Sequence, residues 1–180
     1  MNMKEFDNYI CSLKYPVLKS RPNLKGYDGE IQRGYSLGII YVRPPQQKNG
    51  VEYQDCGRLK WACNKLIFKN SCDFFDRYYP GFQYTTIQYN YCNRSAKHID
   101  GNNVGVSVII AFGDYTGGRL IVYNENDEPE YIDIKNKFYS FNGSKYYHET
   151  EEFQGIRTSL VFFNVGSNVL KSNIKSLNNI

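Results

Sequence analysis

The side chains of this chain that are best suited to chemistry are its two histidines and one nearby aspartate. His98 and Asp100 form a His-x-Asp segment, and His148 is the second histidine of the 180 residues. Side chains at positions i and i+2 of an extended segment lie on the same face, so His98 and Asp100 can reach one ion. His148 comes from a later segment and must be brought to them by folding. Together the three side chains can bind one face of an octahedral ion and leave three positions open.

The types of ligand narrow the choice of metal. Two imidazoles and a carboxylate are the ligand set of non-haem Fe(II) oxygenases, and the thiolates favoured by zinc or copper(I) are absent from it. A hydrolytic zinc site with the same three ligands remains open on the ligands alone. The five cysteines have irregular spacings and no Cys-x-x-Cys pair. This pattern predicts reduced thiols rather than a disulfide framework or a structural zinc site.

Arg157 and Ser159 favour an oxygenase over a hydrolase. They follow His148 at the start of a predicted strand, where side chains two residues apart face the same side. An arginine can bind a carboxylate through two parallel hydrogen bonds, and a serine hydroxyl can add another donor. A zinc hydrolase needs no such anchor. An enzyme that uses 2-oxoglutarate needs one, because the carboxylate distal to the metal requires a partner.

The strand before His98 supplies further candidates for contact with this cosubstrate. Tyr89 could line its pocket, although packing within the sheet is the competing interpretation. Gln88 and Asn90 share a face of the same strand, so we expect one of them, Asn90 above all, to donate a hydrogen bond to the cosubstrate.

The elements that must position these side chains are mainly strands. Apolar periodicity and Gly/Pro signals predict helices over 5–13 and 58–75, the second covering one face of a sheet. Predicted strands cover 35–43, 82–91, 104–112, 120–123, 131–134, 138–141 and 158–163, and a tight turn covers 113–118. Many short strands at intervals of roughly 8–12 residues are typical of a β-sandwich or a jelly-roll.

The chain is expected to form a single domain. It divides into an N-terminal extension over 1–34, a core over 35–164 and a polar tail over 165–180, with no linker between domains. No apolar segment resembles a secretory signal or a membrane span, which predicts an intracellular protein, cytoplasmic or nuclear, without a membrane partner. A net charge of +4 and a pI of about 8.7 permit a nucleic-acid partner without the clustered basic residues that would indicate one.

Over 35–164 the sequence resembles the Fe(II)/2-oxoglutarate-dependent dioxygenases. The segments TIQYN, HID, NVGVS and GDYTGGRLIV look like those of small viral, algal and protist members. These members are related to the ten-eleven-translocation and base-J hydroxylases and, more distantly, to prolyl 4-hydroxylases. The resemblance implies a mainly β fold with flanking helices around a double-stranded β-helix, the jelly-roll or cupin-like core. It also implies that His98, Asp100 and His148 bind iron, and that Arg157 and Ser159 bind the distal carboxylate of 2-oxoglutarate.

The same resemblance implies a function. Fe(II) and 2-oxoglutarate would be the cofactors, with ascorbate as a possible reductant, and hydroxylation of a macromolecule would release succinate and CO₂. An arginine at 157, where prolyl 4-hydroxylases usually carry lysine, favours a nucleobase in DNA or RNA over a prolyl-type protein substrate. The lack of a DNA-reading insertion or a cysteine-rich domain counts against duplex DNA. A catalytically silent binding module on the same fold is the alternative from another class, and the oligomeric state stays open.

Overall fold

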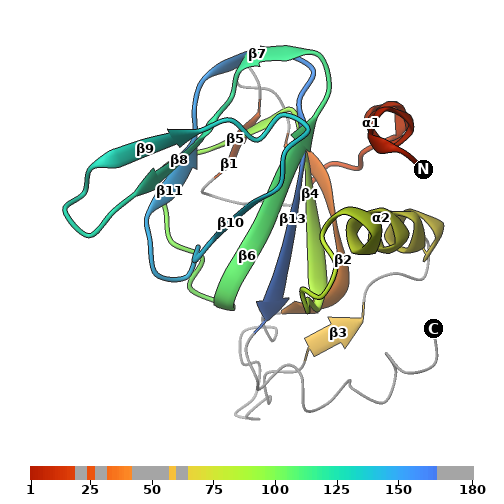
Figure 1. Ribbon diagram of the computed structural model, residues 1–180, viewed down its shortest axis with the longest axis horizontal. Helices are drawn as coiled ribbons and strands as arrows, with labels where there is room; N and C mark the ends of the chain where they lie inside the picture. The colour runs from red at the N-terminus through yellow and green to blue at the C-terminus, as the bar shows by residue number, and fades with distance from the viewer. Residues whose placement is uncertain (19–23, 27–31, 42–56, 60–64, 166–180) are drawn as a thin grey trace, which may run out of the picture.

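The computed structural model describes residues 1–18, 24–26, 32–41, 57–59 and 65–165, which hold two helices and thirteen strands (Figure 1). The helices are α1 (Met3–Ser12) and α2 (Lys65–Tyr78). The strands are β1 (Leu24–Gly26), β2 (Arg33–Tyr41), β3 (Gly57–Leu59), β4 (Thr86–Tyr91), β5 (Asn93–Ser95), β6 (Asn103–Phe112), β7 (Tyr115–Gly117), β8 (Leu120–Tyr123), β9 (Pro129–Ile132), β10 (Tyr139–Phe141), β11 (His148–Thr150), β12 (Phe153–Gly155) and β13 (Thr158–Val165).

Two antiparallel sheets form the body of the fold. The larger has six strands in the order β10-β6-β13-β4-β2-β3, and the smaller has three in the order β11-β8-β9. Two further pairs, β1-β5 and β12-β7, complete the strands of the described residues. Both helices lie on one side of the large sheet, and the small sheet lies on its other side (Figure 1). The predicted mainly β fold with flanking helices is therefore confirmed.

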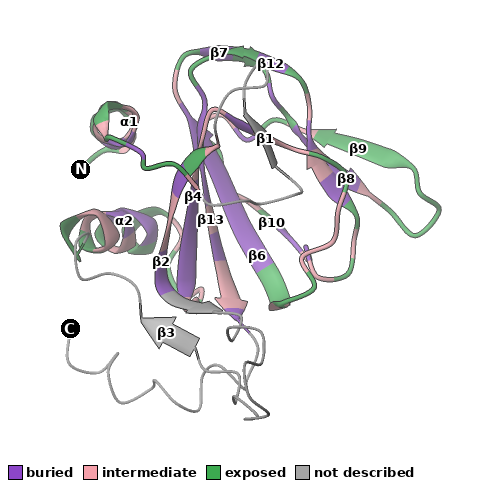
Figure 2. Cartoon of the chain, turned by 180° about the vertical axis from the view of Figure 1, so that it is seen from behind, coloured by how far each residue is buried: buried purple, intermediate pink, exposed green. Residues whose placement is uncertain are grey.

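The alternation along β13 shows how the sequence separates the two faces of the large sheet. Leu160 and Phe162 point to the helices, where both are fully buried. Phe75 of α2 stacks on Phe162 with ring centroids 4.0 Å apart, and Phe74 of α2 stacks on Phe6 of α1 at 3.8 Å. The predicted role of the second helix, covering one face of a sheet, is thus confirmed, and the central strands are buried along most of their length (Figure 2).

The opposite face of the large sheet forms a second apolar cluster with the small sheet. Ile109 and Ala111 of β6 meet Leu120 and Val122 of β8 and Phe141 of β10 in this cluster. These side chains fill the space between the sheets over much of its length. The remaining space between the sheets holds the polar side chains described in the next subsection.

Several predicted boundaries differ from the structure. The helix predicted over 58–75 is wrong at its start, because Gly57–Leu59 is strand β3, paired with the edge of β2. The tight turn predicted over 113–118 contains a short strand, β7, which pairs with β12. The segment is therefore not a simple turn. The strand predicted over 131–134 is β9, two residues earlier. β3 pairs with β2, β7 with β12 and β9 with β8, and these pairings set the strand boundaries.

Other predictions fall partly outside the described residues. The strand predicted over 35–43 extends beyond Tyr41, the last described residue of β2. Nearly all of the polar tail over 165–180 also lies outside the described residues. Neither of the two helices of the described residues is long and apolar enough to cross a membrane.

Candidate metal centre and cosubstrate pocket

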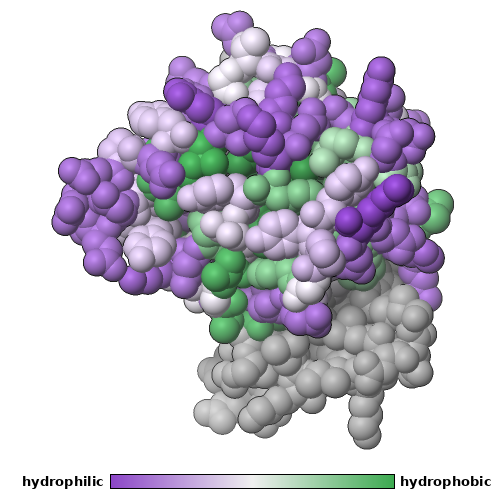
Figure 3. All heavy atoms as spheres, viewed as in Figure 1, coloured by the Kyte–Doolittle hydropathy of each residue, from purple (hydrophilic) through white to green (hydrophobic). Residues whose placement is uncertain are grey.

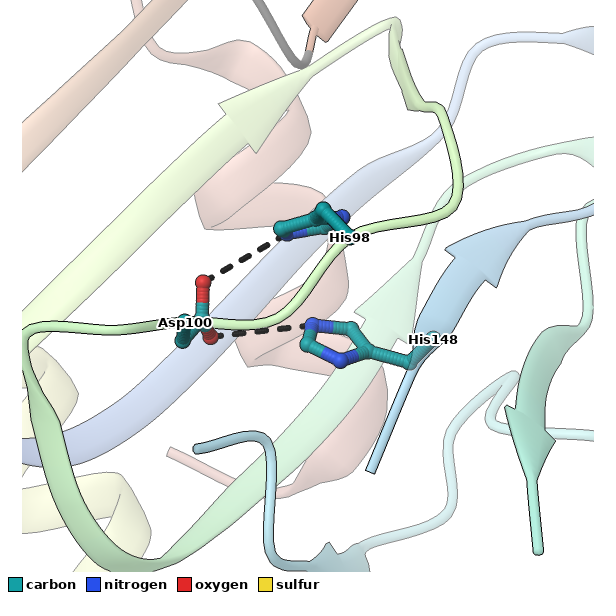
Figure 4. A group of neighbouring side chains, drawn as sticks. All are labelled: His98, Asp100 and His148. Carbon is teal, nitrogen blue, oxygen red and sulfur yellow. Dashed lines mark ion pairs between the residues drawn. The ribbon is translucent and has the colours of Figure 1, made fainter. Parts of the chain in front are cut away.

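The structure brings His98, Asp100 and His148 together at one end of the space between the sheets (Figure 4). The Nε2 atom of His98 lies 3.4 Å from Oδ1 of Asp100, and Nε2 of His148 lies 3.6 Å from Oδ2. One ligand atom from each residue can be chosen so that all three lie within 4.8 Å of one another. This is the arrangement expected of three ligands around one ion, and residues 98 and 148 come from segments 50 positions apart.

Backbone pairing aligns the two histidines. The amide of each one donates to the carbonyl of the other, at 3.0 Å in both directions, in an isolated antiparallel bridge. The Nδ1 atom of His98 lies 2.7 Å from the carbonyl oxygen of Ala96, and Nδ1 of His148 lies 3.1 Å from that of Tyr146. A carbonyl only accepts, so each Nδ1 carries the proton and each Nε2 keeps a free lone pair for a metal.

The two imidazoles have opposite pKa shifts. Burial lowers the pKa of His98, but its hydrogen bonds with Asp100 and the Ala96 carbonyl outweigh burial and raise the pKa overall. Burial lowers the pKa of His148, and its neighbour His98 lowers it further, although Asp100 acts in the opposite direction. The deeper histidine is therefore held neutral, which is the form that binds a metal.

A cavity of about 110 Å³ begins at these three residues and follows the inner face of the large sheet. Its floor includes polar side chains of β4 and β13, which form a hydrogen-bonded row with Ser36 of β2 outside the lining. Ser36 donates to Oε1 of Gln88, Nε2 of Gln88 lies 3.3 Å from Oδ1 of Asn90, and Nδ2 of Asn90 lies 3.5 Å from Oγ of Ser159. The predicted candidates Asn90 and Ser159 thus line the cavity that contains the three candidate metal ligands.

Arg157 lies just before β13, two positions before Ser159, and is 2% exposed. It does not line the cavity itself. Its Nε donates to the carbonyl of Gly118 at 3.1 Å, and its guanidinium carbon lies 5.6 Å from the ring centroids of both Tyr115 and Phe153. Among the described residues, no carboxylate lies within 4.0 Å of it. Burial lowers its pKa, with Tyr115 opposing that effect.

Gly118 is the reason that Arg157 fits. Its φ of 69° is a left-handed conformation that favours glycine. A Cβ atom at this position would lie 2.9 Å from Cδ of Arg157 and 3.0 Å from its Nε. Gly118 therefore leaves room for the Arg157 side chain. The sequence predicted only a turn at this glycine, without this packing role.

The structure contradicts the predicted contact between Tyr89 and the cosubstrate. Tyr89 is fully buried in the cluster beneath the helices, and its ring meets that of Tyr35 edge-on with centroids 6.0 Å apart. Its neighbours Gln88 and Asn90 line the cavity instead. Successive side chains of a strand point to opposite faces, so Tyr89 and Asn90 could not both have faced the cavity.

Two residues near the candidate metal ligands were not predicted from the sequence. Asn103 follows Asp100 by three residues, and its Nδ2 donates to Oδ2 of Asp100 at 3.0 Å. Gly143 accepts from the amide of Asp100 at 2.9 Å, and a Cβ there would lie 3.2 Å from Oδ2 of Asp100 and 3.3 Å from Cε1 of His148. The Asp-Gly-Asn-Asn turn was a signal for the first, since an Asx side chain three residues on can reach back to Asp100. No local sequence pattern indicates the contact that Gly143 makes with Asp100.

No protein-family model matches this sequence, and no curated protein matches it. Solved structures do match its fold. A 2OG-Fe(II) oxygenase family oxidoreductase from Burkholderia pseudomallei has a TM-score of 0.56 at 16% identity, over 89% of this chain and 77% of its own. NgTET1 in complex with 5mC DNA has a TM-score of 0.55 at 13% identity, over 99% and 76%. OsALKBH1 has a TM-score of 0.54 at 11% identity, over 90% and 92%.

At these identities the likeness concerns the fold. The chain has the double-stranded β-helix fold of the 2OG-Fe(II) oxygenases, as its sequence resemblance implied. It also brings His98, Asp100 and His148 into one cluster that could hold a metal ion.

Proposed function

We propose that this protein is an Fe(II)- and 2-oxoglutarate-dependent dioxygenase that hydroxylates a macromolecular substrate and releases succinate and CO₂. The observation that carries the proposal is the pairing of two features in one fold. One is a three-ligand cluster of two histidines and a carboxylate. The other is Arg157, a buried guanidinium with no carboxylate partner among the described residues, which lies two positions before cavity-lining Ser159 and packs against Tyr115 and Phe153.

The donor set fits Fe(II). Imidazole nitrogens and a carboxylate oxygen are ligands that a non-haem iron accepts, and three protein ligands leave room for a cosubstrate that binds through two atoms and for O₂. Ile109, Leu120 and Phe141 form an apolar part of the cavity wall. These side chains keep water from the reacting atoms.

The far end of the site fits a dicarboxylate. A buried charge without a partner is strongly unfavourable, so an anion that pairs with Arg157 removes that penalty. Asn90 and Ser159 line the cavity on the side nearest Arg157 and offer an amide and a hydroxyl. The metal cluster would hold the 2-oxo acid end of 2-oxoglutarate, and Arg157 with Ser159 would hold its distal carboxylate.

When bound, the iron and cosubstrate supply the oxidation of a C–H bond by O₂, coupled to decarboxylation of 2-oxoglutarate. The protein's own part is to fix the ligands, orient the cosubstrate and place one C–H bond of the substrate. A cavity of about 110 Å³ that takes a cosubstrate has little room left. A substrate that presents its reacting carbon from outside the cavity, as a macromolecule can, fits this arrangement.

Two substrate classes remain, with a nucleobase in DNA or RNA slightly favoured by the arginine at 157. NgTET1, whose fold this chain shares, was solved with 5mC DNA. One observation favours a protein substrate instead. Lys97, next to His98, is paired with Asp127 at 2.5 Å, and Lys145 is paired with Glu125 at 2.8 Å. The acidic partners therefore compete with a phosphate for these lysines.

The two acidic partners, Asp127 and Glu125, belong to the turn between β8 and β9, which projects as a hydrophilic lobe on the left of the molecule (Figure 3). Carboxylates on this lobe repel a phosphate backbone that approaches from that side.

Succinate formation tests the proposal and separates the two classes. The protein would be incubated with Fe(II), ascorbate, O₂ and 2-oxoglutarate, together with single-stranded oligonucleotides or with proline-containing peptides. We expect one class to stimulate succinate release above the level without substrate, and Asp100→Ala to abolish the stimulation. No succinate with any substrate, together with no metal binding, would favour a catalytically silent module on this fold. Weaker binding at higher salt would mark a nucleic-acid substrate.

A further inference from the structure

We infer that Asn103 is a positioning residue for the metal centre, one that holds the carboxylate of Asp100 so that it binds the metal through a single oxygen. This inference rests on the proposed function for its consequence and on the hydrogen bonding around Asp100 for its evidence.

The backbone of Asp100 is fixed on both sides. Its amide donates to the carbonyl of Gly143 at 2.9 Å, and its carbonyl accepts from the amide of Asn103 at 3.0 Å, which closes a turn over residues 100–103. The turn carries the Asn103 side chain back over Asp100. There Nδ2 donates to Oδ2 at 3.0 Å, a normal distance for this bond.

The two carboxylate oxygens of Asp100 are consequently not equivalent. Oδ2 accepts a hydrogen bond from Asn103 and faces Nε2 of His148 at 3.6 Å, whereas Oδ1 faces Nε2 of His98 at 3.4 Å. An amide hydrogen that occupies a lone pair of Oδ2 weakens that oxygen as a ligand and fixes the rotation of the carboxylate. Hydrogen bonds to ligating groups commonly have this effect.

The number of bound oxygens matters for the proposed reaction. A carboxylate that bound through both oxygens would take a fourth position on an octahedral ion. Only two positions would then remain, fewer than a two-atom cosubstrate and O₂ require together. By keeping Asp100 to one metal-bound oxygen, Asn103 would leave the third coordination position open.

The test measures the metal site directly. Metal-free protein would be titrated with Co(II), which reports its coordination through its visible absorption, in wild type, Asn103→Ala and Asn103→Leu. The leucine variant keeps the volume of the side chain and removes the donor. Asn102→Ala is the matched control, because Asn102 is the exposed neighbour in the same turn. Melting of the metal-free proteins checks their folding.

We expect both Asn103 variants to bind Co(II) about 10- to 100-fold more weakly, with an altered spectrum at saturation, and the control to match wild type. Wild-type affinity and spectrum in a folded Asn103→Ala or Asn103→Leu protein would overturn the inference while leaving the proposed function intact. If wild type itself binds neither Co(II) nor Fe(II), the proposed function fails first, so the two failures are distinguishable.

Discussion

At the scale of single residues, the site depends on side chains that would be unfavourable without a ligand. Arg157 is buried between two aromatic rings and is bonded to the carbonyl of Gly118. Asp100 lies against two imidazoles whose Nδ1 atoms face carbonyls. Among the residues that the structure describes, no carboxylate pairs with Arg157, and Asp100 belongs to a cluster that could hold a metal ion. The proposed cosubstrate and metal would bind at these two groups.

Gly118→Ala tests whether the position of Arg157 matters. The added Cβ would lie 2.9 Å from Cδ of Arg157, so the arginine must move away from the cavity end. We expect the Kd for 2-oxoglutarate to rise by about tenfold, which corresponds to roughly 1.4 kcal/mol, with metal affinity unchanged. Isothermal titration of the metal-loaded protein measures both. Gly101→Ala is the control, because a Cβ there meets no atom within 4 Å. Equal cosubstrate affinity in all three proteins would contradict the role of Arg157.

At the scale of elements, one strand serves two purposes through its alternation. The residues of β4 that face the helices build the core, and those that face the small sheet build the cavity floor. This division predicts different effects for adjacent substitutions. Asn90→Ala removes a polar group from the cavity, and we expect it to weaken 2-oxoglutarate binding. Tyr89→Phe changes only the helix-facing side, and we expect wild-type binding. Cosubstrate titration compares them, and weaker binding in Tyr89→Phe would show that the face assignment is wrong.

The helix α2 is expected to contribute to stability but not to the site. Phe75 is fully buried and stacks on Phe162 of β13, on the face away from the cavity. Phe75→Ala should lower the free energy of unfolding by about 3–5 kcal/mol, through lost burial and the cavity that remains. Urea denaturation measures this loss. The protein that remains folded should bind metal with wild-type affinity, and a large loss of metal affinity at low denaturant would contradict the separation of the two faces.

The sequence predicted those parts of the fold and site that depend on local patterns. The His-x-Asp segment placed two ligands on one face, and the alternation of β13 placed Ser159 in the cavity. Strand β3 was mistaken for a helix start because its conformation depends on pairing with the end of β2, Ile39–Tyr41, which the local pattern does not show. Tyr89 was misplaced although it shares the apolar face of β4 with Ile87 and Tyr91, which packs in the core beneath the helices. The fit of Arg157 against Gly118 depends on segments 39 residues apart.

At the scale of the whole molecule, the site joins the two sheets. His148 belongs to the small sheet, whereas Asn90, Ser159 and Asn103 belong to the large one. A metal and a cosubstrate bound between them would hold the sheets together, and ligands that bind only the folded state stabilise it.

Thermal unfolding should report this linkage. We expect Co(II) to raise the Tm of the metal-free protein and 2-oxoglutarate to raise the Tm further. At a 2-oxoglutarate concentration one hundred times its Kd, the second increase corresponds to roughly 2.7 kcal/mol of added unfolding free energy. A chelator should reverse both increments. Arg157→Ala should keep the Tm increase caused by Co(II) and lose most of the increase caused by 2-oxoglutarate. An identical second increment in that variant would mean that the cosubstrate binds elsewhere.

The most direct test of the proposed function is an anaerobic titration of the protein with Fe(II) and 2-oxoglutarate. A 2-oxo acid that chelates Fe(II) gives a weak metal-to-ligand charge-transfer band in the visible, which neither component gives alone. We predict the band in wild type, its loss in Asp100→Ala, and its appearance only at higher 2-oxoglutarate concentration in Arg157→Ala. No band in wild type, with tight zinc binding in its place, would contradict the oxygenase and favour a hydrolytic or structural metal site.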